Sequence, residues 1–312
     1  MVISVIIPCR NEVRTIGALL DDIAGQIVPG LTVVVADGMS DDGTWELLKR
    51  RVAAAGDPFL LRIVRNPNRT IPQGLNHAVR AAPEGIIIRL DAHGRIPPGY
   101  LYAIAEAIGE RRDLLVGPRI RMVPGGTGVV ARVIAALLGT AIGTGGTASR
   151  GSLVAPHEVD HTVMSCWHRA VWERVGGFDE SLLANEDFCF DWLARRAGCT
   201  VLSLPVPEYR LEARATLRAL ARQRWRYGWW KAAVLRRHPT SLHLRQALPP
   251  LTLIALATVP FWSSVAALVL GAVWVALIWV LAVPRIVRNG TAPWWVVMPL
   301  VPVVAGVIQL VW

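Results

Sequence analysis

Residues 2–8 read VISVIIP, residues 31–37 read LTVVVAD and residues 85–91 read GIIIRLD. Each run is short and rich in β-branched residues, as expected of strands that are buried on both faces of a parallel sheet. Further patterns lie between them, with helices predicted at 16–23, 41–55 and 71–82 and another strand at 59–64. Strands that alternate with helices predict right-handed βαβ units and a doubly wound α/β sheet.

Polar side chains follow the predicted strands. Asn11 and Glu12 come after the first strand, Asp37 ends the second, and Asp91 ends the strand at 85–91. Ligands of such sheets bind outside the carboxyl ends of the strands, so these side chains predict a site. No G-x-G-x-x-G fingerprint and no P-loop pattern occurs, and carboxylates repel phosphates unless a divalent cation lies between them. The pattern therefore favours a metal–nucleotide complex.

The charge of the chain is concentrated beside an apolar tail. Of the 312 residues, 53% are hydrophobic, and the formal net charge is +10. Nine basic residues and no acidic one lie between 214 and 245; no charge lies between Arg245 and Arg285, and none follows Arg288. This distribution excludes a wholly soluble protein. We expect the basic belt to face anionic lipid, and we expect no nucleic-acid partner.

The apolar tail is long enough for more than one membrane span. Residues 248–283 would extend about 54 Å as one helix at about 1.5 Å per residue, whereas a bilayer core is about 30 Å thick. We therefore expect spans at about 248–264 and 265–283, and a third at 293–312. Basic residues flank the first pair of spans on both sides, so both flanks are expected in the cytoplasm.

The chain divides into three predicted parts. A catalytic domain covers 1–212, a basic and aromatic juxtamembrane segment covers 213–246, and a transmembrane region covers 247–312. The first apolar run is too short for a signal peptide, and the four cysteines form no C-x-x-C pair. We expect a multi-pass protein of the inner or plasma membrane whose catalytic domain lies in the cytoplasm.

Three motifs in order resemble those of family 2 glycosyltransferases: residues 7–12 (IPCRNE), residues 36–44 (ADGMSDDGT) and residues 90–93 (LDAH). The resemblance covers about residues 1–235 and implies a GT-A fold, inversion at the sugar carbon and a nucleotide-sugar donor. Two motifs depart from the family pattern. Where the family usually has two adjacent Asp residues, this chain has Ala36-Asp37, and in place of the D-x-D motif it has Asp91-Ala92-His93. The second variant, with Asn185-Glu186-Asp187 downstream, is most similar to succinoglycan-type exopolysaccharide glucosyltransferases, whose substrates are lipid-linked saccharides.

A divalent cation would neutralise the charge that develops on the leaving diphosphate. Asp91 and His93 can both face one ion if the backbone bends between them. A carboxylate with an imidazole fits Mn²⁺ better than a set of oxygens alone does, although Mg²⁺ also fits. His161 is a candidate third ligand, with a structural role as the alternative. The cofactor expected is therefore Mn²⁺ or Mg²⁺.

The donor is expected to be a UDP-sugar. In the family's second motif, Asp37 would accept a hydrogen bond from the base or ribose. Arg69 and Asn76 flank the third strand and can reach the base or the phosphates. The predicted donor-binding residues are Pro8, Asn11, Glu12, Asp37, Arg69, Asn76 and Asp91.

An inverting transfer needs a base that takes the proton of the acceptor hydroxyl. Glu186 and Asp187 precede a predicted helix at 188–197, where acidic residues also stabilise the helix dipole. By resemblance to the family's Glu-Asp motif, Asp187 is the base and Glu186 binds the acceptor or supports the site. The preceding Gly176, Gly177 and Phe178 match the acceptor-side loop of the family.

The helix-like segment at 223–231 has two interpretations. Gln223, Arg226 and Tyr227 resemble the Q-x-x-R-W signature, with Tyr in place of Trp, and this resemblance implies contact with the acceptor and the diphosphate. Trp beside Arg is also typical of an amphipathic helix at a membrane surface, and both roles can hold together. The Gly-rich stretch at 124–152 is either a mobile loop or an interfacial helix.

The function expected from the sequence is sugar transfer from a UDP-sugar to a polyprenyl-diphosphate-linked saccharide, in exopolysaccharide or cell-wall glycan synthesis. A polyprenyl-phosphate sugar synthase is a second enzymatic interpretation. A catalytically silent nucleotide-sugar sensor or scaffold is an alternative of another class, which the presence of both Asp91 and Asp187 disfavours.

Overall fold

The computed structural model describes residues 2–26, 28–140, 155–242, 263–288 and 294–310, with the single positions 251, 254 and 258. The chain forms two compact units, which are described separately. The first unit comprises residues 1–121 and 152–211, and the second comprises 122–151 and 212–312. The second unit thus takes in residues 122–151, which the sequence patterns placed within the catalytic domain.

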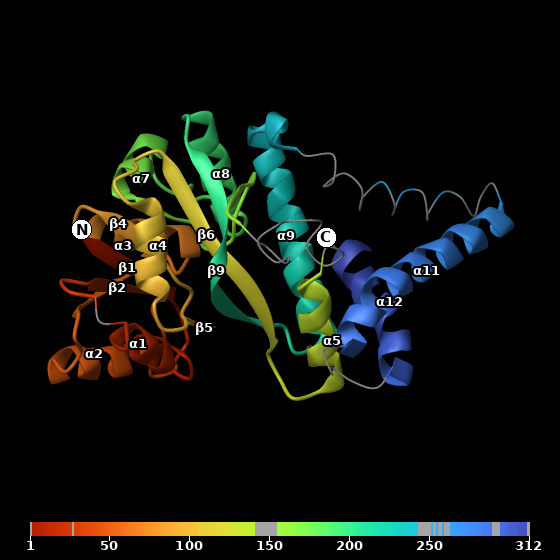
Figure 1. Cartoon of the computed structure of the whole chain (residues 1–312), viewed down its shortest axis with the longest axis horizontal. Helices are drawn as coiled ribbons and strands as arrows, with labels where there is room; N and C mark the ends of the chain where they lie inside the picture. Colours follow the sequence, from red (N-terminus) through yellow and green to blue (C-terminus); the bar gives the residue numbers. More distant parts are fainter. Residues whose placement is uncertain are drawn as a thin grey trace. The chain divides into compact units, whose positions relative to one another are not determined.

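The first unit is built on a mixed sheet with the strand order β3-β2-β1-β4-β8-β6-β9-β5, and β7 pairs with β9 (Figure 1). The strands are β1 (Ile3–Cys9), β2 (Thr32–Asp37), β3 (Leu60–Arg65), β4 (Ile86–Arg89), β5 (Gly94–Arg95), β6 (Leu114–Pro124), β7 (His157–Glu158), β8 (Cys166–His168) and β9 (Thr200–Ala213). The first four pair in parallel, and β8 joins β4 antiparallel. The predicted α/β sheet is confirmed, with an antiparallel half that the sequence did not indicate.

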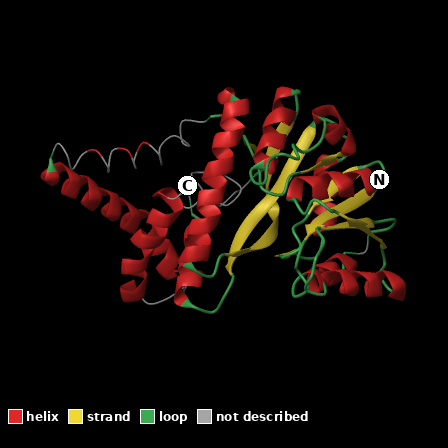
Figure 2. Cartoon of the chain, turned by 180° about the vertical axis from the view of Figure 1, so that it is seen from behind, coloured by secondary structure: helices red, strands yellow, loops and turns green. Residues whose placement is uncertain are grey.

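Helices lie on both sides of the strands of this unit (Figure 2). They are α1 (Ile16–Ala24), α2 (Thr44–Ala54), α3 (Ile71–Ala81), α4 (Tyr100–Ile108), α7 (Arg169–Val175) and α8 (Glu186–Arg196). The strand order reverses between β1 and β4, because β2 and β3 lie on one side of β1 and the next strand joins on the other side. This reversal is the place where an open α/β sheet binds its ligand.

The core of the first unit follows from the sequence patterns. Every residue of β2 is buried, as its uninterrupted apolar sequence predicts. On α1 the buried residues recur every three or four positions, so that one face of the helix packs on the sheet. Phe178 stacks on Phe190 of α8, with the ring centroids 4.5 Å apart, and Trp167 and Phe178 pack edge to face. This aromatic cluster fixes the loop that leads into α8.

The second unit is helical. It contains α5 (Val129–Leu138), α9 (Leu217–Arg237), the short 3₁₀ turn η2 (Pro239–Ser241), α11 (Ser264–Arg288) and α12 (Trp294–Leu310). Its core joins the buried faces of α5, α11 and α12 with Leu220 of α9. Among the described residues of the stretch at 124–152, residues 129–138 form α5, whose apolar side is buried within this unit; residues 141–152 lie outside the described residues.

One helix in the described part of the chain, Ser264–Pro284, is long and apolar enough to cross a membrane. It corresponds to the span predicted at 265–283. The span predicted at 248–264 lies almost wholly outside the described residues. The third predicted span corresponds to α12, a shorter apolar helix that contains Pro299 and Pro302.

Candidate active site

Hydrogen bonds join the loop that follows β1 to the loop that follows β2. The side-chain amide of Asn11 donates to Asp41 Oδ1 at 2.8 Å, and its carbonyl accepts from the Asp41 N–H at 3.0 Å. The Glu12 N–H donates to Thr44 Oγ1 at 2.9 Å. Asn11 has a φ of 57°, which Asn tolerates better than most residues do. Asn11 therefore connects the two loops at the edge of the site. Asp41 is hydrogen-bonded to both the oxygen and the nitrogen of the Asn11 side chain.

Asp37, the last residue of β2, is fully buried. Its Oδ2 accepts from Arg65 Nη1 at 2.8 Å and from the Ser40 N–H at 3.2 Å. The Arg65 guanidinium lies over the Trp45 ring, 3.5 Å from its centroid. The other carboxylate oxygen, Oδ1, is buried without a hydrogen-bond partner among the described residues. Because a buried acceptor without a partner is costly, this oxygen suits an N–H or O–H group of a bound ligand.

The backbone at Asp91 is clamped from another strand. Tyr209 of β9 is fully buried, and its hydroxyl accepts from the Asp91 N–H at 3.0 Å and donates to the Asp91 carbonyl at 3.1 Å. A Cβ on Gly94 would overlap the Tyr209 hydroxyl, so only glycine allows this approach. Tyr209 could not be predicted from the sequence, because nothing in the chain near it marks a contact with a strand end over one hundred residues earlier.

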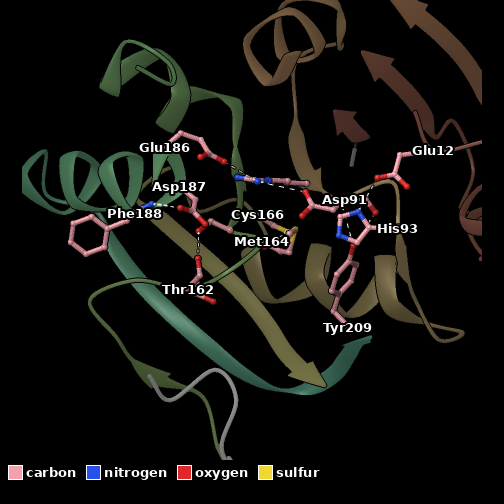
Figure 3. A network of polar contacts seen from close by, with 12 residues as sticks. Glu12, Asp91, His93, Thr162, Met164, Cys166, Glu186, Asp187, Phe188 and Tyr209 are labelled. Atoms are coloured by element: carbon pink, nitrogen blue, oxygen red, sulfur yellow. Dashed lines mark hydrogen bonds and ion pairs between the residues drawn. The ribbon is translucent and has the colours of Figure 1, made fainter. Parts of the chain in front are cut away.

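His93 meets Glu12 at the point where the strand order reverses. His93 Nδ1 lies 3.2 Å from Glu12 Oε1, and Thr15 Oγ1 donates to Glu12 Oε2 at 2.7 Å. Burial alone would raise the pKa of Glu12, but the hydrogen bonds from His93 and Thr15 lower it overall. Figure 3 shows Glu12, His93 and Asp91 on neighbouring loops. A carboxylate on Nδ1 orients an imidazole for coordination through Nε2.

The three predicted metal ligands do not form one set. Among the described residues, no group of three or more His, Cys, Asp or Glu side chains is placed to hold a metal ion. His161 instead bonds to Asp191 and faces Asp187. Asp91 and His93, which follow β4, remain the candidate ligands. An oxygen ligand with an imidazole oriented by Glu12 fits Mn²⁺, and also fits Mg²⁺.

Arg89 links Asp91 to the acidic pair of α8. It is the last residue of β4, is almost fully buried, and places Nη2 3.2 Å from Glu186 Oε1 and 3.6 Å from Asp91 Oδ1. Burial disfavours its charged form, but Asp91, Glu186 and Asp187 more than offset this and raise its pKa. Arg89 was not predicted as a site residue. A charged side chain within the apolar run at 85–91 is the feature of the sequence that could have identified it.

Glu186 and Asp187 open α8, and their surroundings differ. Burial raises the pKa of Glu186 and the charge of Asp187 raises it further, while Arg89 opposes both. Burial acts in the same direction on Asp187, but the charges of His161 and Arg89 and the Phe188 N–H, 2.7 Å from Oδ1, bring the pKa of Asp187 below its usual value. Asp187 therefore stays ionised at a pH at which Glu186 holds its proton.

Asn76, predicted to bind the donor, contacts the loop of Gly177 and Phe178, which was predicted to face the acceptor. The Asn76 amide accepts from the Trp172 and Phe178 N–H groups and donates to the Phe178 carbonyl and Glu180, so all its positions are occupied. Gly177 has a φ of 86°, and a Cβ there would lie 3.0 Å from Asn76 Oδ1. Phe178 lies in the aromatic core. Asn76 thus holds this loop in place, and its predicted contact with the donor stays a prediction.

The remaining predicted residues lie elsewhere. Pro8 sits in β1 opposite Ala36 of β2, and Arg69 is exposed, with a φ of 61°. Gly176 ends α7 with a φ of 87°. Gln223, Arg226 and Tyr227 belong to α9 of the second unit, where Gln223 donates to the Tyr227 hydroxyl at 3.2 Å and the Arg226 guanidinium lies 5.8 Å from the Tyr227 ring centroid.

The fold and these side chains define a GT-A-like transferase, with an Asp at the end of β2, Asp-x-His after β4 and an acidic pair opening α8. The chain belongs to glycosyltransferase family 2. The model described as "Glycosyl transferase family 2" matches residues 4–166, and that described as "Glycosyl transferase family group 2" matches residues 86–308. The chain is therefore a glycosyltransferase.

Similar proteins agree with this assignment. The chain is 32% identical to the succinoglycan biosynthesis protein ExoA of Rhizobium meliloti, over 88% of this chain and 85% of that protein. It is 27% identical to the polyprenol monophosphomannose synthase of Mycolicibacterium smegmatis, over 65% of this chain and 75% of that one. Its fold resembles that of a Pyrobaculum calidifontis mannosyltransferase, PcManGT, in complex with GDP-Man and Mn²⁺ (20% identity, TM-score 0.63, 99% of this chain and 86% of that one).

Proposed function

We propose that this enzyme inverts the sugar carbon and transfers a sugar from a nucleoside-diphosphate donor to a saccharide linked to polyprenyl diphosphate. The observation that carries the proposal is the position of Arg89, whose guanidinium contacts both Asp91 and Glu186. The predicted donor site and the predicted base are therefore neighbours around one buried cation. Direct displacement needs this proximity, because the base and the leaving diphosphate act on opposite sides of one sugar carbon.

The donor side is supported by Asp37, Asp91 and His93. The unpartnered Oδ1 of Asp37 suits a donor group of the base or ribose. Asp91 and His93 are the residues that would hold Mn²⁺ or Mg²⁺, and such an ion neutralises charge on a leaving diphosphate. The sequence resemblance favours UDP, whereas the solved neighbour was determined with GDP-Man and Mn²⁺, so both nucleotides belong in the test.

The acceptor side is supported by the opposite proton affinities of the α8 pair. An ionised Asp187 can take the proton of an acceptor hydroxyl as the oxygen attacks, and Glu186, which keeps its proton, can donate a hydrogen bond. Arg89 stays charged between the two sides, where its charge also favours the ionised form of Asp187.

The lipid-linked acceptor is supported by the tail and by the relatives. Ser264–Pro284 can span a membrane, and on α9 Trp225 and Trp229 are each 66% exposed within a basic segment. One relative is named for succinoglycan biosynthesis and another for a polyprenol product. We infer synthesis of an exopolysaccharide or cell-wall glycan at the cell membrane, with the catalytic unit in the cytoplasm.

The test is a donor and acceptor screen with the full-length enzyme in membranes or detergent. UDP-sugars and GDP-sugars are supplied with a membrane lipid extract, and release of UDP or GDP and label in the lipid fraction are measured. We expect lipid-dependent release that EDTA abolishes and Mn²⁺ or Mg²⁺ restores. Release that occurs equally without the lipid extract would exclude the proposed acceptor.

Polyprenyl phosphate is a second candidate acceptor, which the similarity to the polyprenol monophosphomannose synthase favours. A phosphate oxygen is already deprotonated and needs no base. Asp187→Asn separates the two candidates, because it would leave turnover with polyprenyl phosphate near normal and would impair transfer to a sugar hydroxyl.

A further inference from the structure

His161 and Asp191 form a buried pair that the proposed reaction does not use. Asp191 is fully buried in α8 and accepts from the Thr162 N–H at 3.0 Å and from Ser165 Oγ at 2.7 Å. Its Oδ2 also lies 2.8 Å from His161 Nδ1. The other ring nitrogen, Nε2, lies 3.9 Å from Asp187 Oδ2. The imidazole thus stands between two carboxylates of one helix.

The His161 imidazole lies where a positive charge would reduce the repulsion between Asp187 and Asp191. Asp187 and Asp191 are four residues apart in α8, so they lie on one face of the helix, and two like charges in this arrangement repel each other. Asp191 is fully buried and the Asp187 side chain is 25% exposed, so water screens the repulsion only in part. A positive imidazolium between them compensates both charges, and the hydrogen bonds to Asp191 hold that charge in place.

Other charged groups also face Asp187. Arg89 approaches from β4, Glu186 precedes it on α8, and Asp91 lies on the other side of Arg89. Arg89 divides its charge among three carboxylates, whereas His161 lies within ion-pair distance of Asp187 and Asp191, and its charge is the largest of the effects that lower the pKa of Asp187. His161 is therefore the cation best placed to act on Asp187.

We propose that His161, held by Asp191, is a positioning residue that keeps the Asp187 carboxylate ionised and fixed in place, an inference that rests on the proposed role of Asp187 as base. A base must be free of its proton before the acceptor hydroxyl arrives, and burial works against this. The imidazolium opposes the effect of burial. His161 needs no contact with the substrate in this role.

The test compares pH profiles of kcat for the full-length enzyme and two variants, His161→Gln and His161→Lys. Gln removes the charge, so one of the effects that oppose burial is lost and the acid limb of the profile moves to higher pH by about 1–3 units. Because the pKa of Asp187 starts below its usual value, turnover falls at acidic pH and recovers toward neutral pH. Lys restores a positive charge and returns the limb toward that of the wild type. A parallel loss at every pH in both variants would reduce His161 to a structural role.

Two further measurements keep the outcomes separate. His161→Asn also removes the charge and keeps an N–H donor for Asp191, so it should move the acid limb in the same direction; it carries the test if His161→Gln does not fold. The Mn²⁺ concentration that gives half-maximal activity should not change in His161→Gln. A weaker dependence on Mn²⁺ without a pH shift would make His161 a metal ligand and overturn the proposal.

The Asp187→Asn and His161→Gln variants together distinguish an error in the role of His161 from an error in the role of Asp187. If Asp187→Asn is inactive and His161→Gln keeps the wild-type acid limb, only the role of His161 is wrong. If Asp187→Asn turns over normally, the assignment of the base is wrong, and the role of His161 is excluded with it.

Discussion

Asp187 and Glu186 are neighbours in the chain, yet their surroundings act on their protons in opposite directions. Asp187→Asn keeps the size of the side chain and its hydrogen-bonding capacity while it removes the basicity. We expect kcat to fall by about 10²–10⁴-fold, with donor binding unchanged, because a positioned base contributes about that factor. Steady-state kinetics and nucleotide binding by calorimetry measure the two effects.

Glu186→Gln is the matched control, because it changes the adjacent carboxylate in the same way. It should reduce kcat less than Asp187→Asn does. An inactive Glu186→Gln beside an active Asp187→Asn would exchange the two roles. Full activity of both variants would exclude general-base catalysis and would favour a phosphate acceptor.

Asp37 tests nucleotide recognition. A contact with the base or ribose persists from the bound donor to the transition state, so its loss weakens binding in both states. Asp37→Ala should therefore raise the donor KM more than it lowers kcat. Asp113→Ala, which removes an exposed carboxylate paired with Arg111, should leave both constants unchanged. An effect of Asp37→Ala confined to kcat contradicts the assignment.

At the scale of single residues, the sequence predicted the side chains that lie at strand and helix ends, namely Asp37, Asp91, Glu186 and Asp187. It could not predict Arg89, Tyr209 or Asp191 as parts of the same network, because the partners of these side chains lie 97, 118 and 29 residues away in the chain. Asn76, predicted to bind the donor, and Phe178, predicted for the acceptor loop, both take part in hydrogen bonds or packing within the first unit, and their predicted binding roles stay predictions.

At the scale of elements, the predicted helices at 41–55 and 71–82 correspond to α2 (Thr44–Ala54) and α3 (Ile71–Ala81). The antiparallel half of the sheet was not predicted. β8 has only three residues and pairs with β4 from about 80 residues away, so a local pattern carries little information about it. The parallel half was predictable because each strand is a continuous apolar run followed by a helix.

The clamp between β9 and the end of β4 can be tested at this scale. Tyr209→Phe removes the hydroxyl that bonds both backbone groups of Asp91 and leaves them without that partner. We expect the free energy of unfolding to fall by about 1–3 kcal/mol. Denaturant unfolding in detergent measures this, with Tyr102→Phe, at a side chain that is 62% exposed, as the control. Equal stability of the two variants would show that the clamp contributes little.

For the whole molecule, the helices of the tail contribute to the core of the second unit. In the second unit, α5 and α9 share a core with α11 and α12, in which Val133, Ile134 and Leu137 of α5 are fully buried. α5 lies far from the tail in sequence, between β6 and β7. Its apolar side therefore depends on helices that the tail contributes at the other end of the chain.

Deletion of residues 246–312 tests this dependence. The deletion removes α11 and α12 and uncovers the apolar side of α5, whose burial of three large side chains is worth about 1.5–3 kcal/mol for each of them. We expect the truncated chain to aggregate or to require detergent, even though every proposed donor-binding residue remains in it. Size-exclusion chromatography with and without detergent, together with nucleotide binding, measures this. A truncated chain that is monodisperse in buffer and binds UDP would mean that α5 does not need the tail, and that the tail acts only in holding the enzyme at the membrane.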